Sequence, residues 1–434
     1  MKTRLRFGSW LACGMLALPG LAAADGNAEW AVADAATVWN EIAAASVAAG
    51  RPGPIGQVDL GLVAAAGHDA VQAIERRFEP YFAEVRDAHG SRSAAYAAAT
   101  HDVLVAFYPA QAATLDPTLA TYLANNGLTG DPGIAVGQAV AARIATLRRL
   151  NPNPLPAPYI GSTAIGQWRP TPSFLPGAPA AFSPMAVPWM GSFDPLTMTG
   201  PSRFRAPPPP ALTSLRYALD YNEVKAKGAL TGSTRTAEET DAAYFWSENF
   251  AVQWNRAARA IAINHVRKIG DRARLFALIN LAGADALITA WDSKTYYNIW
   301  RPITAINEGD ADGNAMTAGD PAWQSLINNP NYPDYTSGAN NISAAMLRTM
   351  ALFFNRDRLD FDVTSNAANV VQRTRTFRKF SQAAQEVVDA RVLLGIHFRF
   401  ADTAARKQGE QVAEWVSDHF LLPVVPDYHS HKND

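Results

Sequence analysis

Three short segments in the C-terminal half of the chain combine cationic, hydroxyl and imidazole side chains that could bind an oxyanion. The first segment runs from Trp291 to Pro302 and contains Lys294 and Arg301, which are seven residues apart. On a helix this spacing is close to two turns, so we expect both cations on one face. Two cations beside aromatic side chains suit a tetrahedral oxyanion. A solvated basic face, with cation stems lying over the aromatics, would show the same spacing.

The second segment contains a Ser-Gly pair at the predicted start of a helix. Ser337 precedes an apolar, periodic run and has the residue type of a helix N-cap. Its hydroxyl, the backbone N–H of Gly338 and the positive end of the helix dipole would together attract an anion. Ordinary helix capping is the simpler explanation for an isolated Ser-Gly pair, so both interpretations stay open at this point.

The third segment places a histidine between two arginines. Arg391, His397 and Arg399 lie in a strongly apolar stretch that we expect to be helical. A neutral imidazole with arginine nearby can act as a nucleophile or as a ligand. A buried structural histidine is the alternative.

Periodic apolar spacing predicts that helices position these segments. The expected helices lie near residues 240–268, 271–299, 338–355, 381–399 and 402–420. Thr236 and Glu239 have the spacing of a capping box where this region begins. Because residues 25–150 show helical spacing too, and strand-like alternation is almost absent, we expect an all-α fold.

The proline-rich middle of the chain interrupts the helical pattern. Residues 151–210 hold 16 of the 29 prolines, and proline blocks helix interiors. The same stretch also carries large apolar side chains, so we expect it to wrap over the helical body. The expected parts are a signal peptide (1–24), an N-terminal helical region (25–150), the proline-rich irregular segment (151–235), the catalytic helical bundle (236–422) and a polar tail (423–434).

The first 24 residues have the pattern of a secretory signal peptide. Three basic residues precede an apolar stretch, and small residues follow it. We therefore expect an exported protein, periplasmic or secreted. Cys13 allows a lipidated cysteine as a second interpretation, in a poor sequence context. Cleavage would remove this single cysteine, so a metal site in the mature protein would use nitrogen and oxygen ligands.

The charge balance argues against a nucleic-acid-binding protein, and the hydropathy argues against a membrane-spanning one. There are 38 Lys and Arg residues against 39 Asp and Glu, a net charge of −1, without the basic excess of a nucleic-acid-binding protein. After the signal segment, no stretch has 18 uncharged apolar residues, so the sequence predicts no membrane span.

Taken together, the three segments are far more specific than any one of them. Their order is Lys-x6-Arg-Pro, then Ser-Gly at a helix start, then Arg-x5-His. This order resembles the signature of the vanadium-dependent haloperoxidase and type 2 phosphatidic acid phosphatase superfamily. The stretches "ALINLAGADALITAWDSKTYYNIWRPITAIN" and "LLGIHFRFADTAARKQGEQVAEWV" are similar to its soluble, secreted, haloperoxidase-like branch. The resemblance covers roughly residues 236–422 and implies a helical bundle whose core binds vanadate or phosphate.

The resemblance also implies roles for the cationic and hydroxyl residues. Lys294, Arg301 and Arg391 would hold the equatorial oxygens of the bound oxyanion. The Ser337 hydroxyl and the Gly338 amide would add hydrogen bonds. Fixed guanidinium and ammonium donors stabilise the charge of a five-coordinate centre, whether that centre is vanadium or phosphorus.

The resemblance makes His397 the central residue. It would bind the vanadium of vanadate in a peroxidase, or attack phosphorus in a phosphatase. Trp291 and Tyr332 fall where the family builds its halide pocket. In a peroxidase, Lys294 would polarise bound peroxide for attack by halide.

The sequence departs from the family pattern at Ala339. The second motif usually reads Pro-Ser-Gly-His, whereas this chain has Thr-Ser-Gly-Ala. The missing histidine is the family's acid/base group, and general acid catalysis contributes ~10²–10⁴-fold. Its loss should slow phosphomonoester hydrolysis more than peroxide chemistry. Side chains that could take its place are those of Asn340, Asn341, His265, His429 and His431.

Three functions agree with these observations. The leading expectation is a vanadium-dependent haloperoxidase-like oxidoreductase, in which vanadate-bound H2O2 oxidises a halide. The alternatives are a soluble acid phosphatase that forms a phosphohistidine at His397, and a non-catalytic binder of phosphate or vanadate. The substrates would be H2O2 and halide, or a phosphate ester. A homodimer is expected only by analogy with relatives.

Overall fold

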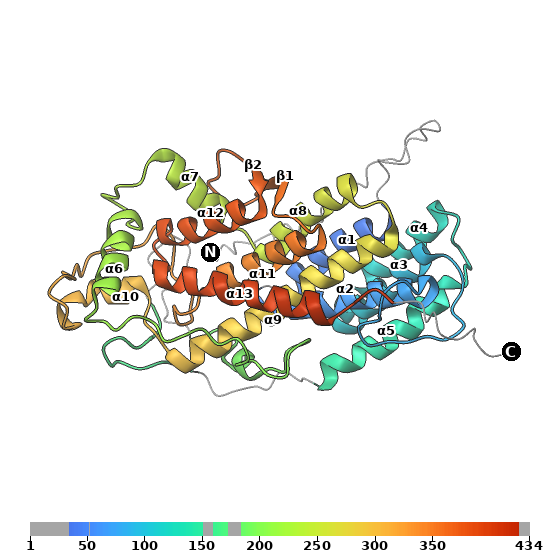
Figure 1. Ribbon diagram of the computed structural model, residues 1–434, viewed down its shortest axis with the longest axis horizontal. Helices are drawn as coiled ribbons and strands as arrows, with labels where there is room; N and C mark the ends of the chain where they lie inside the picture. Colours follow the sequence, from blue (N-terminus) through green and yellow to red (C-terminus); the bar gives the residue numbers. More distant parts are fainter. Residues whose placement is uncertain (1–33, 52, 151–158, 172–183, 425–434) are drawn as a thin grey trace, which may run out of the picture. The chain divides into compact units, whose positions relative to one another are not determined.

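The computed structural model describes residues 34–51, 53–150, 159–171 and 184–424, and this part of the chain is mostly helical (Figure 1). The all-α expectation is therefore confirmed. Within it, the structure adds one antiparallel pair of strands, β1 (Arg358–Thr364) and β2 (Thr374–Lys379), in which Phe361 pairs with Phe377. The predicted signal peptide and most of the predicted polar tail lie outside the described residues.

The helices follow one another along the chain in two groups. The N-terminal helices are α1 (Ala35–Gly50), α2 (Pro54–Glu75), α3 (Arg92–Phe107), α4 (Ala112–Asn125) and α5 (Gly133–Leu150). The later helices are α6 (Leu215–Lys227), α7 (Ala237–Phe245), α8 (Phe250–His265), α9 (Ile269–Tyr297), α10 (Pro302–Asn307), α11 (Gly338–Phe353), α12 (Phe380–Leu393) and α13 (Arg399–His419). Three short 3-10 helices join them: η1 (Pro109–Gln111), η2 (Pro188–Ser192) and η3 (Gly309–Ala311).

Helix α9 is the central element of the fold. It packs against α2 on one side and against α11 and α13 on the other. Its length and apolar composition would allow it to cross a membrane, but almost all of its most apolar stretch is buried inside the protein. A helix that is apolar all round is expected in the core of a large helical fold.

Four helix ends meet at one end of the bundle. Figure 1 shows the C-terminal ends of α9 and α12 and the N-terminal ends of α11 and α13 at the same end of the bundle. The two N-terminal ends direct the positive ends of their dipoles toward this place. All three segments singled out in the sequence lie at these ends.

Two of the predicted helices differ from the observed ones. The run expected at 240–268 is two helices, α7 and α8, and the side chain of Asn249 caps the second by accepting from the N–H of Ala251. The helix expected at 381–399 ends at Leu393. The capping box is confirmed: Thr236 Oγ1 accepts from the N–H of Glu239 (3.1 Å), and Glu239 Oε2 accepts from the N–H of Thr236 (2.8 Å).

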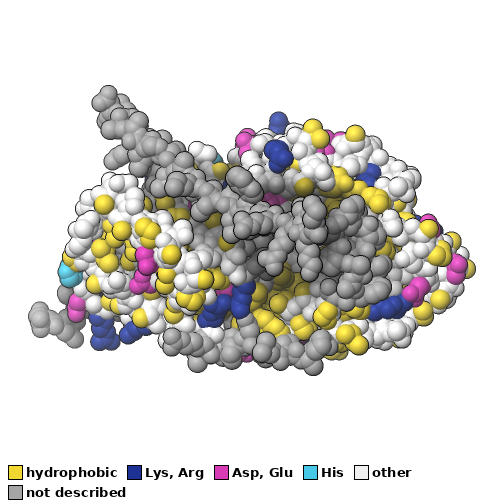
Figure 2. Space-filling model, turned by 180° about the vertical axis from the view of Figure 1, so that it is seen from behind, with side chains coloured by type: hydrophobic (Ala, Val, Ile, Leu, Met, Phe, Trp, Pro, Cys, Tyr) yellow, Lys and Arg dark blue, Asp and Glu magenta, His cyan; other side chains and the backbone are white. Residues whose placement is uncertain are grey.

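The described parts of the proline-rich segment lie on the helices. Asp285, in the middle of α9, accepts hydrogen bonds from the backbone N–H groups of Leu196 (2.6 Å) and Thr197 (2.8 Å). Trp168 is fully buried and stacks on Tyr159. On the face that Figure 2 shows, Lys and Arg side chains are interspersed with Asp and Glu side chains, in agreement with the net charge near zero.

Candidate active site

Lys294 lies in the last turn of α9 and is fully buried. Its Nζ donates to the backbone oxygens of Pro333 (2.6 Å) and Asp334 (3.1 Å). The same Nζ lies 4.9 Å from the centre of the Tyr332 ring. Burial, together with the nearby Arg301 guanidinium, lowers the pKa of Lys294 well below its ordinary value.

The expectation that Lys294 and Arg301 share one helix face is wrong. Helix α9 ends at Tyr297, because Asn298 takes a left-handed conformation with φ +50°. Arg301 instead occupies the N-cap position of α10, ahead of a proline at the first helical position, where proline is favoured. The two cations still meet, because the Arg301 Nε donates to the Tyr332 backbone oxygen (2.7 Å), next to the carbonyls that Lys294 binds.

The expectation that His397 lies within a helix is also wrong. It lies in the turn between α12 and α13, whereas Arg391 is in the last turn of α12 and Arg399 begins α13. Gly395 makes this turn possible, since it has φ +77° and a Cβ there would lie 2.4 Å from the Gly228 backbone oxygen. The apolar run through this segment therefore reflects burial of a turn and does not reflect helical packing.

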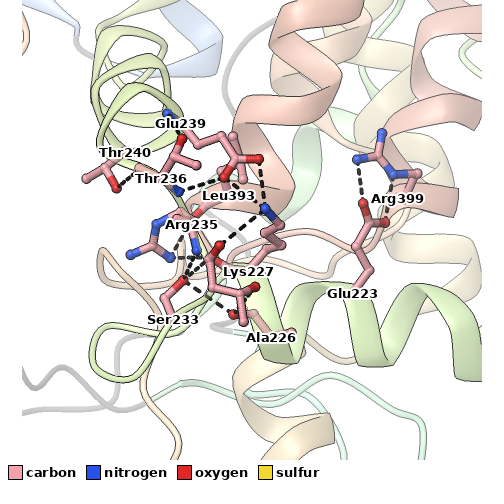
Figure 3. Close-up of polar contacts among 11 residues, drawn as sticks. Glu223, Ala226, Lys227, Ser233, Arg235, Thr236, Glu239, Thr240, Leu393 and Arg399 are labelled. Carbon is pink, nitrogen blue, oxygen red and sulfur yellow. Dashed lines mark hydrogen bonds and ion pairs between the residues drawn. The ribbon is translucent and has the colours of Figure 1, made fainter.

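Polar contacts with α6 and with the loop after it hold both ends of this turn (Figure 3). Arg235 donates to the backbone oxygen of Leu393 (3.1 Å), at the end of α12. Glu223 of α6 accepts two hydrogen bonds from Arg399, both 2.7 Å, and Asp389 accepts a third from the same guanidinium (2.6 Å). The bidentate Arg399–Glu223 pair and these single hydrogen bonds fix the geometry of the residues around His397.

The contacts of the His397 ring determine which nitrogen carries the proton. Nε2 lies 3.2 Å from the Arg301 Nη1, and Nδ1 lies 2.7 Å from the Asp334 Oδ1. Because arginine can only donate, Nε2 must be the acceptor and Nδ1–H donates to the carboxylate. Burial and the three cations lower the pKa of His397 well below its ordinary value. The ring is therefore neutral, with the lone pair on Nε2.

Asp334 was missed as a functional residue by the sequence interpretation, although it lies inside the second segment. It is fully buried and Arg301 Nη1 lies 3.8 Å from its Oδ1. Burial raises the pKa of Asp334 to about 7, against the opposing effect of Arg301 and Lys294. Nothing in the sequence pattern marks this aspartate, because its partner His397 is 63 residues away.

Ser337 is the N-cap residue of α11, as predicted, but its side chain does not cap the helix. Its Oγ instead accepts from the Asn340 Nδ2 (3.5 Å), and its side chain is close enough to Asp402 to lower the pKa of that carboxyl group. Ordinary capping is therefore not the role of this hydroxyl. Gly338 follows, and a Cβ at this position would lie 3.2 Å from Trp291 Cζ3, so the helix start approaches the indole closely.

Asp402 is the second buried carboxyl group that the sequence interpretation missed. It lies in the first turn of α13, five residues after His397, and is fully buried. The Asn340 Nδ2 donates to its Oδ1 (2.8 Å) and lies 3.5 Å from Ser337 Oγ. An acidic residue in a helix's first turn is common, so only its burial distinguishes this one.

Arg391 completes a group of three buried cations. Its Nη1 donates to the backbone oxygen of Trp246 (3.0 Å), and its charge contributes to the lowered pKa values of His397 and Lys294. Within the described part of the chain, Arg391 Nε and Arg301 Nη2 are buried without any hydrogen-bond partner. A buried donor without a partner is costly, and a bound anion would satisfy both.

This set of donors fits an oxyanion better than a bare metal ion. Among the described residues, no three His, Cys, Asp or Glu side chains are grouped so that they could hold a metal ion. Lys294, Arg301 and Arg391 instead offer N–H groups, which match the oxygens of vanadate or phosphate. His397 Nε2 is the one imidazole lone pair beside these groups, so it would be the atom that binds the central vanadium or phosphorus.

The aromatic residues predicted for the halide pocket lie together. The ring centres of Trp291 and Tyr332 are 4.9 Å apart, and Lys294 lies over both rings. Trp291 is buried and its Nε1 donates to the Ala186 backbone oxygen (3.2 Å), so the proline-rich segment fixes the indole. Tyr332 is partly exposed and forms the outer part of this pair.

Only some candidates for the missing acid/base histidine lie near the site. Ala339 is partly exposed. Asn340 contacts Asp402, and Asn341 Nδ2 donates to the hydroxyl of Thr336 (2.9 Å). His265 is exposed at the end of α8 and packs against Phe354, at the far end of α11. His429 and His431 lie outside the described residues.

Comparisons with known proteins agree with the haloperoxidase-like resemblance. Residues 274–424 match the family model described as the VCPO second helical-bundle domain. The vanadium chloroperoxidase of Curvularia inaequalis is 24% identical over 297 residues, which is 53% of this chain and 48% of that protein. The chain thus aligns with about half the length of this curated relative.

Solved structures show the same fold over most of the chain. The first bacterial vanadium-dependent iodoperoxidase superposes with a TM-score of 0.75 and 20% identity, covering 89% of this chain and 97% of that one. A holo-type bacterial vanadium-dependent chloroperoxidase superposes with a TM-score of 0.70 and 19% identity, covering 91% and 97%. The chain thus has the helical-bundle fold of the vanadium haloperoxidases, and its C-terminal part matches the haloperoxidase family model, in agreement with the resemblance that the order of its three motifs predicted.

Proposed function

We propose that the protein is a vanadium-dependent haloperoxidase-like enzyme that oxidises halide with H2O2. The observation that carries this proposal is the state of His397. Its Nδ1–H is bound by Asp334, and its Nε2 lies 3.2 Å from the Arg301 guanidinium, whose Nη2 has no hydrogen-bond partner among the described residues. Vanadate, when bound, supplies a centre that activates hydrogen peroxide.

The residues of the chain bind, orient and stabilise the oxyanion. Lys294, Arg301 and Arg391 neutralise its charge, and their positions are fixed before binding, so little reorganisation is needed. Asp334 holds His397 in the tautomer that presents Nε2 and stabilises positive charge on the ring. Trp291 and Tyr332 form an apolar wall that suits a weakly hydrated halide.

The test is reconstitution with orthovanadate, followed by an assay of bromide-dependent halogenation with H2O2. We expect a rate that requires vanadate and that His397→Ala abolishes. His265→Ala, an exposed histidine at the other end of α11, is the matched control and should retain the full rate. An enzyme that binds vanadate but shows no vanadate-dependent rate with any halide would contradict the proposal.

A soluble acid phosphatase is the second candidate, and the buried carboxyl of Asp402 beside Ser337 favours it, because ester cleavage requires a proton donor. Its nucleophile would be His397 Nε2, and a phosphohistidine should be trapped there. The two enzymes respond oppositely to vanadate, which would inhibit the phosphatase and activate the peroxidase. Phosphate binding without turnover in either assay would indicate a non-catalytic oxyanion binder.

We also propose that the protein is exported and that residues 1–24 are removed. The basic and apolar pattern of that segment supports this proposal. N-terminal sequencing of protein from the periplasm and from the medium would test it. A homodimer is proposed by analogy alone, and light scattering of the purified protein would test it.

A further inference from the structure

The proposed chemistry needs a proton donor, and the residue after the Ser-Gly pair cannot supply one. Ala339 has no titratable group and its side chain is partly exposed. A different residue must therefore carry the proton if the site cleaves an ester or activates a peroxide. Asp402, on a different helix, occupies the same corner of the site.

The contacts of Asp402 connect it directly to the oxyanion site. Its Oδ1 accepts from the Asn340 Nδ2 (2.8 Å) at the start of α11, and the same Nδ2 lies 3.5 Å from the Ser337 Oγ, whose side chain acts on the pKa of Asp402. Oδ2 is buried, and within the described part of the chain it has no further hydrogen-bond partner. A carboxyl group that is buried, bound by neutral donors and left with one free oxygen is suited to hold a proton on that oxygen.

The electrostatic surroundings of Asp402 agree with a protonated group. Asp402 interacts electrostatically with four charged or titratable groups. They are Lys294 of α9, Arg301, Asp334 and Arg391 of α12. Burial raises the pKa of Asp402 well above its ordinary value, and Asp334 raises it further. The hydrogen bonds from Ser337 and Asn340 and the charge of Arg391 oppose this rise without cancelling it.

We propose that Asp402, as a neutral carboxylic acid, is the proton donor of this oxyanion site and takes the place of the family's histidine at the position of Ala339. The proposal rests on the proposed function only in requiring that the site binds an oxyanion. Asp402 donates its Oδ2–H to an oxygen of the oxyanion that Ser337 also contacts. The carboxyl group therefore differs in role from Asp334, which accepts from His397.

The proton transfer can be written for cleavage of a phosphate monoester. The bond between His397 Nε2 and phosphorus forms while the bond between phosphorus and the leaving oxygen breaks. The Asp402 proton moves to that oxygen, so a neutral alcohol leaves. The Asp402 carboxylate then takes a proton from the water that displaces His397, which restores both residues.

Infrared difference spectroscopy with inorganic phosphate provides a test that does not depend on turnover. We expect phosphate binding to shift the carbonyl band of a protonated carboxylic acid, because its O–H gains a new acceptor. Asp402→Asn should remove this band, since the amide has the same shape but no acidic proton. Asp69→Asn is the matched control, because Asp69 is equally buried but lies on α2 and accepts backbone N–H groups of residues 81–83.

Calorimetry of the same variants separates a catalytic role from a structural one. We expect Asp402→Asn to bind phosphate within about threefold of the wild type at pH 6, because the amide can still donate. As the pH rises, the affinity of the wild type should fall more steeply than that of the variant, because the acid loses its proton. A band unaffected by phosphate, or equal pH slopes in both proteins, would overturn the assignment of Asp402. Absence of phosphate and vanadate binding by the wild type would overturn the proposed function itself.

Discussion

Helix α9 carries two buried polar clusters that differ in one respect, which is whether their hydrogen bonds are complete. The amide cluster, in the middle of the helix, is formed by Asn40, Asn255 and Asn280. Asn280 Nδ2 donates to Asn255 Oδ1 (2.9 Å), and Asn255 Nδ2 donates to Asn280 Oδ1 (2.9 Å). Asn40 Nδ2 donates to Asn255 Oδ1 (2.8 Å) and its own oxygen accepts from Arg259 (3.0 Å). Every side-chain polar atom of these three asparagines is paired.

The site at the end of the same helix is charged and incomplete. Lys294 and Arg301 are fully buried and Arg391 is nearly so, and two of the arginine nitrogens have no partner within the described residues. Buried polar groups are normally satisfied, so an incomplete cluster marks the place where a ligand is expected. The amide cluster should therefore contribute to stability, whereas the site should contribute to binding at some cost in stability.

Removing Arg301 should produce the largest change in binding. Arg301→Met keeps the length of the side chain but removes one of three buried cations. Truncating one partner of a buried charged contact costs ~2–5 kcal/mol, which corresponds to a loss of about 30- to 4000-fold in affinity for vanadate or phosphate. Isothermal titration calorimetry measures this loss.

The matched control for this variant is a change at Arg259, which contacts the amide cluster. Arg259→Met removes a buried arginine that binds Asn40, outside the oxyanion site. It should leave the phosphate affinity within about twofold. Equal losses of affinity in the two variants would mean that general destabilisation, and not the lost cation, weakens binding.

The sequence predicted the identity of the cationic residues better than it predicted the elements that position them. Helical periodicity marked the helices, and the motif order marked Lys294, Arg301 and His397. Neither pattern predicted that α9 ends at Tyr297 or that α12 ends before His397, because buried turns are as apolar as buried helices. Glycine at position 395 was the one local signal of that turn.

The two carboxyl groups of the site could not be predicted from local pattern. Asp334 and Asp402 act on partners that are distant in the sequence, so no spacing rule connects them. Their role follows from burial, which is a property of the packed fold. The role of Ser337 also follows from the packed fold. Its residue type and position suggest helix capping, whereas its side chain makes no cap hydrogen bond and acts on Asp402.

Asn280→Ala should produce the largest change in stability among variants of the amide cluster. It removes hydrogen bonds to Gln57 and Asn255 and leaves a small cavity in the core. We expect the free energy of unfolding to fall by about 1–3 kcal/mol, measured by urea denaturation. The phosphate affinity should stay within about twofold. A large loss of phosphate affinity would contradict the conclusion that the amide cluster contributes to stability and the site contributes to binding.

Asp285 lies between the clusters on α9 and should make stability depend on pH. It accepts from Leu196 and Thr197, yet burial raises its pKa to about 6, above the ordinary 3.8. Between these values the folded state holds a proton that the unfolded state has lost, so the stability contributed by Asp285 falls as pH rises from about 4 to 6. Asp285→Asn should remove this dependence, which amounts to about 1–3 kcal/mol.

Urea denaturation at pH 4 and pH 7 measures the effect of Asp285. The difference in unfolding free energy between the variant and the wild type should shift in favour of the variant at the higher pH. A constant difference would show that Asp285 has the same pKa in both states. The carboxyl groups of the site titrate as well, but they are common to both proteins and cancel in the comparison.

Ala339→His should produce the smallest change, a modest rise in turnover. The size of this rise shows how far Asp402 already supplies the proton in the incomplete site. Restoring the family's histidine in the wild type adds a second proton donor to a site that already holds Asp402. We therefore expect turnover to rise only about two- to tenfold, below the ~10²–10⁴-fold that general acid catalysis supplies where no other donor is present. In the Asp402→Asn background the same substitution should restore a larger factor, because it then supplies the missing proton. Equal gains in turnover in the wild type and in Asp402→Asn would show that Asp402 and position 339 act independently. No gain in either protein would show that the site requires no further proton donor.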